Sequence, residues 1–253
     1  MGDGEVLKYE DIVLRESDLD TLQGPCFLTD QIIAFYFSYL SSSEKNLSSS
    51  CKTDDILLVP PSTSILLANC DDDKERLVLF VVNDCDDFCG GDSGSHWSTL
   101  VYSRSMNAFL HLDSMSGANN LLAEKLYDAV KNYMGIGGEV PRKQTSSSLK
   151  KQKNKNKRVQ PVSKSSLKVA NAAPVGLPVF KEWKEMPQQS NGYDCGIYAL
   201  AIAGAIVDWF SNGMDSNDDV LSVVAKRVDQ SVEVRMRGEI LELVQDLRKK
   251  LAH

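Results

Sequence analysis

The stretch that decides the fold is QQSNGYDCGIYALAIAGAIVDWF, residues 188–210. From Gly196 onward it carries no charged residue before Asp208, so the pattern predicts a long helix buried in the core. Asp194 precedes this run and belongs to a residue type that caps helix N-termini. We therefore expect a helix that begins at Cys195 and is capped by Asp194.

Cys195 is chemically well placed in such a helix. A thiol in the first turn faces unpaired backbone N–H groups and the positive end of the helix dipole, which both favour the thiolate. The alternative is a cysteine that only fills space in the core, the usual role of a buried reduced cysteine. The residues that surround Cys195 in the fold decide between these two roles.

A base for Cys195 has few candidates, because the chain has three histidines and one of them is the C-terminal His253. The segments HWSTLVY (96–102) and NAFLHLDS (107–114) are typical of two antiparallel strands. If the turn is centred between Arg104 and Ser105, His96 lies directly opposite Asp113 on one face of the sheet.

Two alternatives to this pairing stay open. A slip of one residue would place a neighbour of Asp113 opposite His96, on the other face. His111 lies two residues before Asp113, on the same strand face, and is a rival base.

Gln189 lies six residues before Cys195. Its side-chain amide can donate to a developing oxyanion together with the backbone N–H of Cys195. Cys, His, Asp and Gln together make the set of groups that thiol hydrolases use.

The rest of the chain predicts an α+β fold. A buried helix is expected in FLTDQIIAFYFSYL (27–40), capped by Thr29 or Asp30 and ended by the serine-rich residues 41–50. The apolar run RLVLFVVND (76–84) favours a strand covered on both faces. Further elements are a strand, turn and short helix in residues 55–70, an amphipathic helix in residues 117–134 and a strand in residues 179–189.

Charge is divided unevenly along the chain. Residues 142–173 hold ten Lys or Arg and no Asp or Glu, which leaves eighteen basic residues against 35 acidic ones elsewhere. The segment is poor in large apolar residues, so we predict a disordered basic insertion loop, with nuclear import or nucleic-acid binding as an alternative to a solvated spacer. With 253 residues, the chain is expected to form one domain, 1–253, around this loop. The acidic body argues for a partner with a basic face and against a requirement for nucleic acid.

The six cysteines are scattered, which predicts reduced thiols. A zinc site at Cys85, Cys89 and His96 is a weak alternative, since the paired spacing and a fourth ligand are missing, so we expect no metal and no cofactor. No run reaches the roughly 18 apolar residues that a membrane span needs. We expect a protein of the cytoplasm and nucleus with no membrane partner.

These segments resemble a known family. HWSTLVY, FLHLDS and QQSNGYDCGIYALA are similar to the His-Trp, Asp-Ser and Gln-x₅-Cys-Gly motifs of the Ulp-type (sentrin-specific) cysteine proteases, and residues 13–40 resemble the family's opening segment. Four motifs in the same order make the resemblance specific, and it covers most of the chain outside the basic loop. GGDSGSHWSTLVY (90–102) and QQSNGYDCG (188–196) most resemble the deneddylase branch, which acts on the modifier called Nedd or Rub.

The resemblance implies a papain-like core with a mixed sheet flanked by helices, and cleavage after the C-terminal Gly-Gly of a ubiquitin-like modifier. It implies that Cys195 is the nucleophile, His96 the base and then acid, Asp113 the group that orients His96, and Gln189 the oxyanion donor. No cofactor is implied, and the expected partners of a monomeric enzyme are Nedd/Rub and its conjugates.

The resemblance also implies substrate-binding residues. Trp97 corresponds to the tryptophan over the diglycine channel, and Phe27 and Asp30 correspond to the ends of the family's Trp-Leu-Asn-Asp motif. Phe27 and Thr29 depart from that motif, and phenylalanine lacks an indole N–H. Without the resemblance, Trp97 would be read as a core residue and Asp30 as a helix cap.

Two other functions remain open at this point. A SUMO protease of the same family would use the same catalytic residues, and the basic loop suits a nuclear enzyme. A non-catalytic modifier-binding protein is the third reading, which is weakened because all four catalytic positions hold competent residues.

Overall fold

The computed structural model describes residues 3–47, 56–60, 77–85, 94–134, 176–212 and 218–251. The basic loop at 142–173, Cys89 of the zinc alternative and the short helix expected after residue 60 lie outside the described residues. No helix in the described ranges is both long and apolar enough to cross a membrane.

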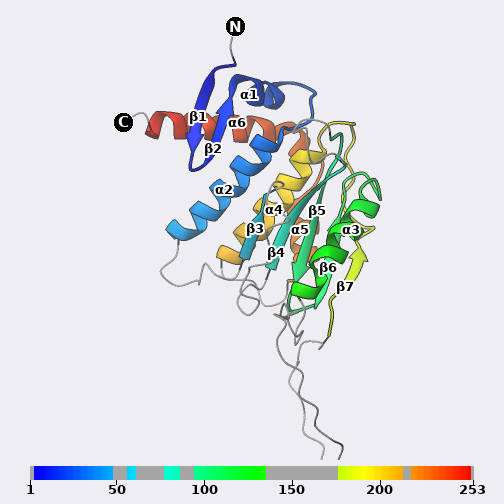
Figure 1. The fold of residues 1–253 in the computed structure, drawn as a ribbon. Coiled ribbons are helices and arrows are strands. Elements are labelled where there is room, and N and C mark those ends of the chain that lie inside the picture. The colour runs from blue at the N-terminus through cyan, green and yellow to red at the C-terminus, as the bar shows by residue number, and fades with distance from the viewer. Residues whose placement is uncertain are drawn as a thin grey trace, which may run out of the picture.

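A five-stranded mixed sheet forms the centre of the fold (Figure 1). Its spatial order is β3 (Ile56–Val59), β4 (Leu77–Asn83), β5 (Trp97–Ser103), β6 (Ala108–Leu112) and β7 (Val179–Glu182). The outer pairs β3–β4 and β6–β7 are parallel, and the two inner pairs are antiparallel. The predicted α+β class with a mixed sheet flanked by helices is confirmed.

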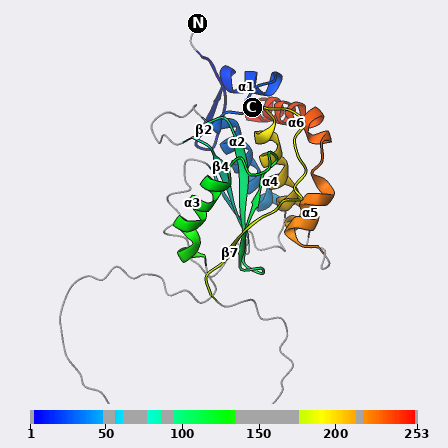
Figure 2. The ribbon, with the colours of Figure 1, turned by 90° about the vertical axis from the view of Figure 1, so that its right-hand side faces the viewer.

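Helices cover both faces of the sheet, with α3 on one side and α4 and α5 on the other (Figure 2). The helices are α1 (Glu16–Gln23), α2 (Asp30–Leu47), α3 (Asn120–Val130), α4 (Cys195–Ser211), α5 (Val220–Arg227) and α6 (Ser231–Leu251). One short 3₁₀ turn, η4 (Lys131–Tyr133), follows α3. A separate hairpin of β1 (Glu5–Tyr9) and β2 (Ile12–Arg15) lies beside α6.

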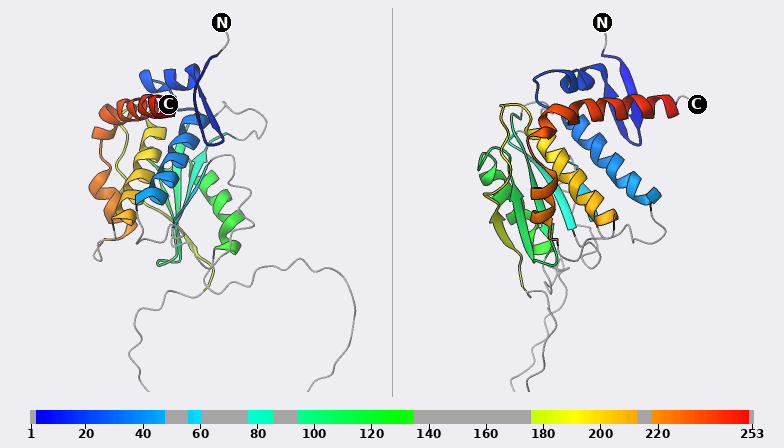
Figure 3. Two further views of the ribbon diagram at one scale, coloured as in Figure 1. Left: turned by 90° about the vertical axis from the view of Figure 1, so that its left-hand side faces the viewer. Right: turned by 180° about the vertical axis from the view of Figure 1, so that it is seen from behind.

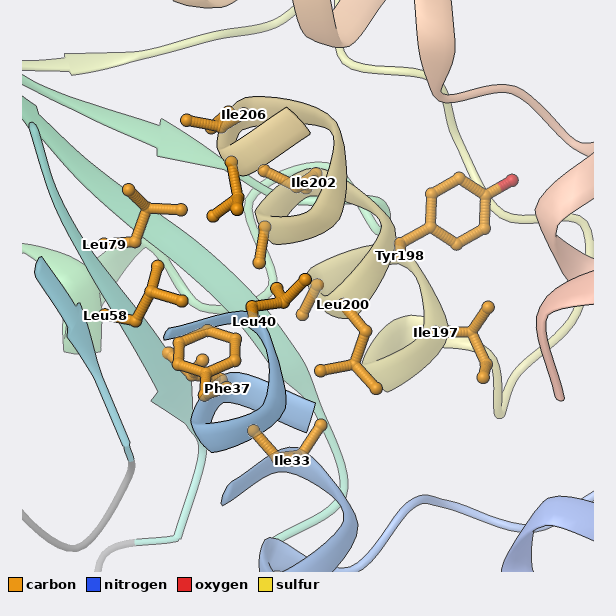
Figure 4. Close-up of a cluster of buried hydrophobic side chains, with 14 of the residues drawn as sticks. Ile33, Phe37, Leu40, Leu58, Leu79, Ile197, Tyr198, Leu200, Ile202 and Ile206 are labelled. Carbon is orange, nitrogen blue, oxygen red and sulfur yellow. The ribbon is translucent and has the colours of Figure 1, made fainter. Parts of the chain in front are cut away.

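Successive side chains of a strand point to opposite faces of the sheet, so alternate residues of the buried strands belong to two separate apolar layers. On β4, Leu79 and Val81 face α2 and α4, whereas Val78 and Phe80 face α3. The larger layer is drawn in Figure 4, where side chains of α2, β3, β4 and α4 interlock. The prediction that residues 76–84 form a strand covered on both faces is confirmed.

The register of the central hairpin corrects the prediction. Thr99 pairs with Leu112 and Ser103 with Ala108, so the pairing is displaced by two residues and His96 is not directly opposite Asp113. The cause is a longer turn, because Asn107 takes a left-handed conformation (φ 43°) and its N–H donates to the carbonyl of Arg104. A shift of two residues keeps the face, so His96 and Asp113 still lie together past the strand ends.

Candidate active site

Cys195 is the first residue of α4 and is buried in the core, as the sequence predicts for the helix start. The prediction that the Asp194 side chain caps this helix is wrong. Asp194 occupies the N-cap position, but its side chain makes no capping bond. Its carboxylate instead accepts from Arg237 on α6 and from the side chain of Asn191. A partner distant in sequence has replaced the local interaction.

His96 and Asp113 form a buried pair. His96 immediately precedes β5, Asp113 immediately follows β6, and His96 Nε2 lies 2.7 Å from Asp113 Oδ1. The other ring nitrogen, Nδ1, makes no hydrogen bond within the described residues. Cys195 is the thiol close enough to interact with this imidazole.

The pKa values of the pair move in opposite directions. Burial lowers the pKa of His96, but the hydrogen bond with Asp113 and the nearby Cys195 outweigh it and raise that pKa to about 9. Burial raises the pKa of Asp113, yet hydrogen bonds from His96 and from two backbone N–H groups hold it below its usual value. At neutral pH the pair is an imidazolium and a carboxylate, so His96 carries a proton that it can donate.

Two polar residues behind the pair hold it in place, and sequence reasoning missed both. Asn119 is fully buried; its backbone N–H donates to Asp113 Oδ2 and its side chain donates to the carbonyl of His96. Asp84 accepts from the backbone N–H of His96 at 2.9 Å. The only sequence signals were an Asn near the start of the predicted helix at 117–134 and an Asp at the end of the predicted strand at 76–84, and both residue types are common in turns.

Gln189 is held by Ser114, the residue after Asp113, to which the Asp-Ser motif gave no role of its own. The Ser114 hydroxyl donates to Gln189 Oε1 at 2.7 Å, and the Gln189 backbone N–H donates to the Ser114 carbonyl. Gln189 Nε2 donates one N–H to the carbonyl of Asn191. Since an amide nitrogen carries two N–H groups, the second is available to another acceptor. Ser114 thus fixes which end of the amide is the donor.

The three predicted substrate-binding residues come together at one segment. Trp97 is buried, and its indole N–H donates to the carbonyl of Leu28 at 3.1 Å, next to Phe27. Phe27 is 42% exposed, so its ring lies at the surface. The Thr29 hydroxyl accepts from Ile32 N, so Thr29 caps α2, and Asp30 lies in the first turn rather than at the cap.

The structure also bears on two alternatives from the sequence, His111 as the base and a zinc site. His111 is fully buried, and both of its ring nitrogens are engaged, by Ser98 Oγ and Asn120 Oδ1. Burial lowers the pKa of His111, so it links strands and helix as a neutral imidazole. Within the ranges that the structure describes, no cluster of three His, Cys, Asp or Glu side chains could hold a metal ion.

Comparison with known proteins places this geometry in a family. Residues 88–240 match the model of the Ulp1 protease family, C-terminal catalytic domain. The chain belongs to the Ulp1 protease family. It is a cysteine protease, and the resemblance predicted from the four sequence motifs is confirmed.

The similar proteins cover almost the whole chain. NEDD8-specific protease 1 of Arabidopsis thaliana is 33% identical over 97% of this chain and 94% of its own length. Sentrin-specific protease 8 of Homo sapiens is 26% identical over 98% and 100%. Among solved structures, the C-terminal Ulp1 protease domain in complex with Smt3, the yeast orthologue of SUMO, has a TM-score of 0.56 at 16% identity over 98% of this chain and 89% of that one. The structural likeness supports the fold.

Proposed function

We propose that this Ulp1-family protease is a deneddylase, which cleaves after the C-terminal Gly-Gly of the modifier Nedd/Rub in precursors and in lysine conjugates. The observation that carries the choice of modifier is the 33% identity with a NEDD8-specific protease over nearly the full length of both chains. The chemistry is supported by Cys195 at a helix start beside the hydrogen-bonded His96 and Asp113.

In the first half of the proposed reaction, the Cys195 thiolate attacks the carbonyl carbon of the modifier's terminal glycine. The oxyanion is stabilised by the backbone N–H of Cys195 and the free amide N–H of Gln189. The His96 imidazolium gives its proton to the leaving lysine amine, and the C–N bond breaks. Asp113 keeps the imidazole oriented through its 2.7 Å hydrogen bond.

In the second half, neutral His96 takes a proton from water, and the resulting hydroxide attacks the thioester. Collapse of the tetrahedral intermediate releases the modifier's carboxylate and restores the thiolate beside the imidazolium. Trp97, Phe27 and Asp30 are proposed to line the channel for the two glycines, where a side chain on the tail would clash.

The test uses purified protein with Nedd8, SUMO and ubiquitin, each carrying a C-terminal electrophile. A covalent adduct with Nedd8 alone is expected, and Cys195→Ala is expected to abolish it. Cys26→Ala and Cys85→Ala are matched controls, since Cys26 is exposed and Cys85 is half-buried. An adduct with SUMO instead would overturn the choice of modifier, and no adduct with any of the three would revive the binding-protein reading.

We also propose that the protein is a monomer, that it is active without nucleic acid, and that it resides in the cytoplasm and nucleus. The acidic body around a basic segment is what motivates the last two. Light scattering, activity after nuclease treatment and microscopy of a tagged chain test them in turn.

A further inference from the structure

Helix α6 lies across the end of the molecule at which α4 begins (Figure 3). Two of its charged side chains, Glu233 and Arg237, are four residues apart and so lie on the same helix face, one turn from each other. Both contact the loop that leads to Cys195, residues 187–194, which has no regular secondary structure. The position of this loop therefore depends on side-chain contacts.

Glu233 binds the part of the loop next to Gln189. Its carboxylate accepts from the Ser190 backbone N–H at 2.7 Å, from the Ser190 hydroxyl, from Asn191 Nδ2 at 3.3 Å and from the Tyr198 hydroxyl at 3.0 Å. Burial raises the pKa of Glu233, but the hydrogen bonds from Ser190, Tyr198 and Asn191 hold it below its usual value. One ionised carboxylate thus fixes both residues that follow Gln189.

Arg237 binds at the other end of the loop. Its Nε and Nη2 donate to Asp194 Oδ1 at 2.8 and 2.6 Å, immediately before Cys195. The same guanidinium donates to the carbonyls of Thr21 and Cys26, and Cys26 immediately precedes Phe27. The Asp194 side chain is 2% exposed, so this ion pair is buried on the carboxylate side. A single side chain joins the residue before the nucleophile to the segment before Phe27.

We propose that Glu233 and Arg237 are positioning residues for the hydrolysis reaction. Glu233 sets where Gln189 lies relative to Cys195, and Arg237 sets the separation between Cys195 and the segment Phe27–Asp30. The inference rests on the proposed function, because it takes Gln189 as the oxyanion donor and Phe27–Asp30 as a wall of the tail channel.

The two residues are expected to affect different kinetic constants. The Glu233 carboxylate binds the loop and Tyr198 of α4, so Glu233→Gln is expected to lower kcat by about tenfold with KM changed less than about twofold. The thiolate attacks the methylene carbon of iodoacetamide and displaces iodide without forming an oxyanion, so the rate of alkylation at Cys195 is expected to stay the same. Glu239→Gln is the matched control, because Glu239 lies on the same helix and pairs with Arg235 at the surface.

A double-mutant cycle tests whether Glu233 acts through Gln189. If it does, Glu233→Gln has little further effect on kcat in a Gln189→Ala background. If the same tenfold loss appears in both backgrounds, Glu233 acts on something else and the inference is overturned for this residue.

Arg237 contacts both the loop and the residues that precede Phe27, so Arg237→Lys is expected to lower kcat and raise KM, each by about fivefold or more. Lysine keeps the positive charge, but it lacks the planar guanidinium group that binds Asp194 and two carbonyls at once. Arg235→Lys on the same helix is its control. Thermal melting and the stoichiometry of alkylation at Cys195 measure the fraction of folded enzyme in each preparation. If the changes in kcat and KM vanish after correction for this fraction, Arg237 has only a structural role and the inference is overturned.

The substrate for these assays is whichever modifier–fluorophore conjugate the wild type cleaves best. If that modifier is SUMO, the proposed function fails while the comparison of variants still runs. If the wild type cleaves Nedd8 and both variants match their controls, the proposed function stands and the inference fails.

Discussion

The His96 ring has two different neighbours on its two nitrogens. Asp113 binds Nε2, and the unbonded Nδ1 is left for Cys195, which interacts with the ring. This arrangement requires the proton shared with the thiol to be carried on Nδ1. The proposed role of His96 therefore depends on the carboxylate of Asp113.

Asp113→Asn tests that dependence. The pKa of His96 is raised to about 9, mainly by the hydrogen bond with Asp113 working against burial. A raised pKa means that the imidazolium is present at neutral pH and is lost as pH rises through about 9. Without the carboxylate the imidazolium is destabilised, so the alkaline limb of kcat/KM is expected to move to lower pH, and kcat to fall by about 10³-fold or more.

The measurement for Asp113→Asn is the pH profile of kcat/KM, paired with that of iodoacetamide alkylation. Asp128→Asn is the control, because Asp128 is an exposed carboxylate that pairs with Lys131. An unchanged alkaline limb in Asp113→Asn would show that another group titrates there.

At the scale of elements, the start of α4 packs directly on the segment before α2. A methyl group on Gly196 would lie 3.1 Å from Cβ and Cδ1 of Leu28, whose carbonyl accepts the Trp97 indole. The Cys-Gly pair is thus explained by close packing. The residue after Cys195 has to be small for the segment before α2 to approach it.

Gly196→Ala is expected to displace Leu28 and lower kcat/KM by about tenfold, mainly through KM, because the proposed channel wall moves. Overpacking offsets the gain in helix propensity, so the free energy of unfolding is expected to fall by only about 1 kcal/mol. Gly204→Ala adds the same methyl further along α4, where it meets the Tyr36 hydroxyl, and is the control. Equal kinetics for the two variants would contradict the packing argument.

Helix α6 offers a stability prediction. Gly238 is exposed in its interior, and a methyl group there would meet nothing within 4 Å. Gly238→Ala is expected to raise the free energy of unfolding by about 0.5–1 kcal/mol with unchanged activity, because alanine loses less backbone entropy in a helix. Urea denaturation measures the change, and a loss of stability would show that α6 is interrupted at this residue.

The elements show what sequence patterns can and cannot predict. The buried helix that begins at Cys195 and the strand β4 could be predicted, because each is a continuous apolar run and the fold buries that run as a single element. The hairpin register was displaced by two residues because a single left-handed Asn107 lengthened the turn. Asp194 was assigned as a cap because its true partner, Arg237, lies 43 residues away on α6. Contacts of that kind depend on tertiary packing and leave no local pattern.

At the scale of the whole molecule, the site and the basic insertion are attached to opposite ends of the sheet. His96 and Asp113 lie past one end of β5 and β6. At the other end, Asn107 Nδ2 donates to the carbonyl of Gly176, the first described residue after the insertion, and Val179 pairs with Ala108. Strand β6 therefore separates the attachment point from Asp113 by its full length.

This separation predicts that the basic segment is dispensable for the chemistry. Replacing residues 142–173 by a Gly/Ser segment of the same length is expected to leave kcat/KM within about twofold at 0.15 M salt, where charges more than about 8 Å apart are largely screened. A variant with the ten Lys and Arg residues of this segment changed to Gln separates the effect of charge from that of the other side chains. A rise in KM confined to low salt would show that the segment steers the modifier to the acidic body. A fall in kcat at every salt concentration would contradict the separation, because the segment would then have to reach the site itself.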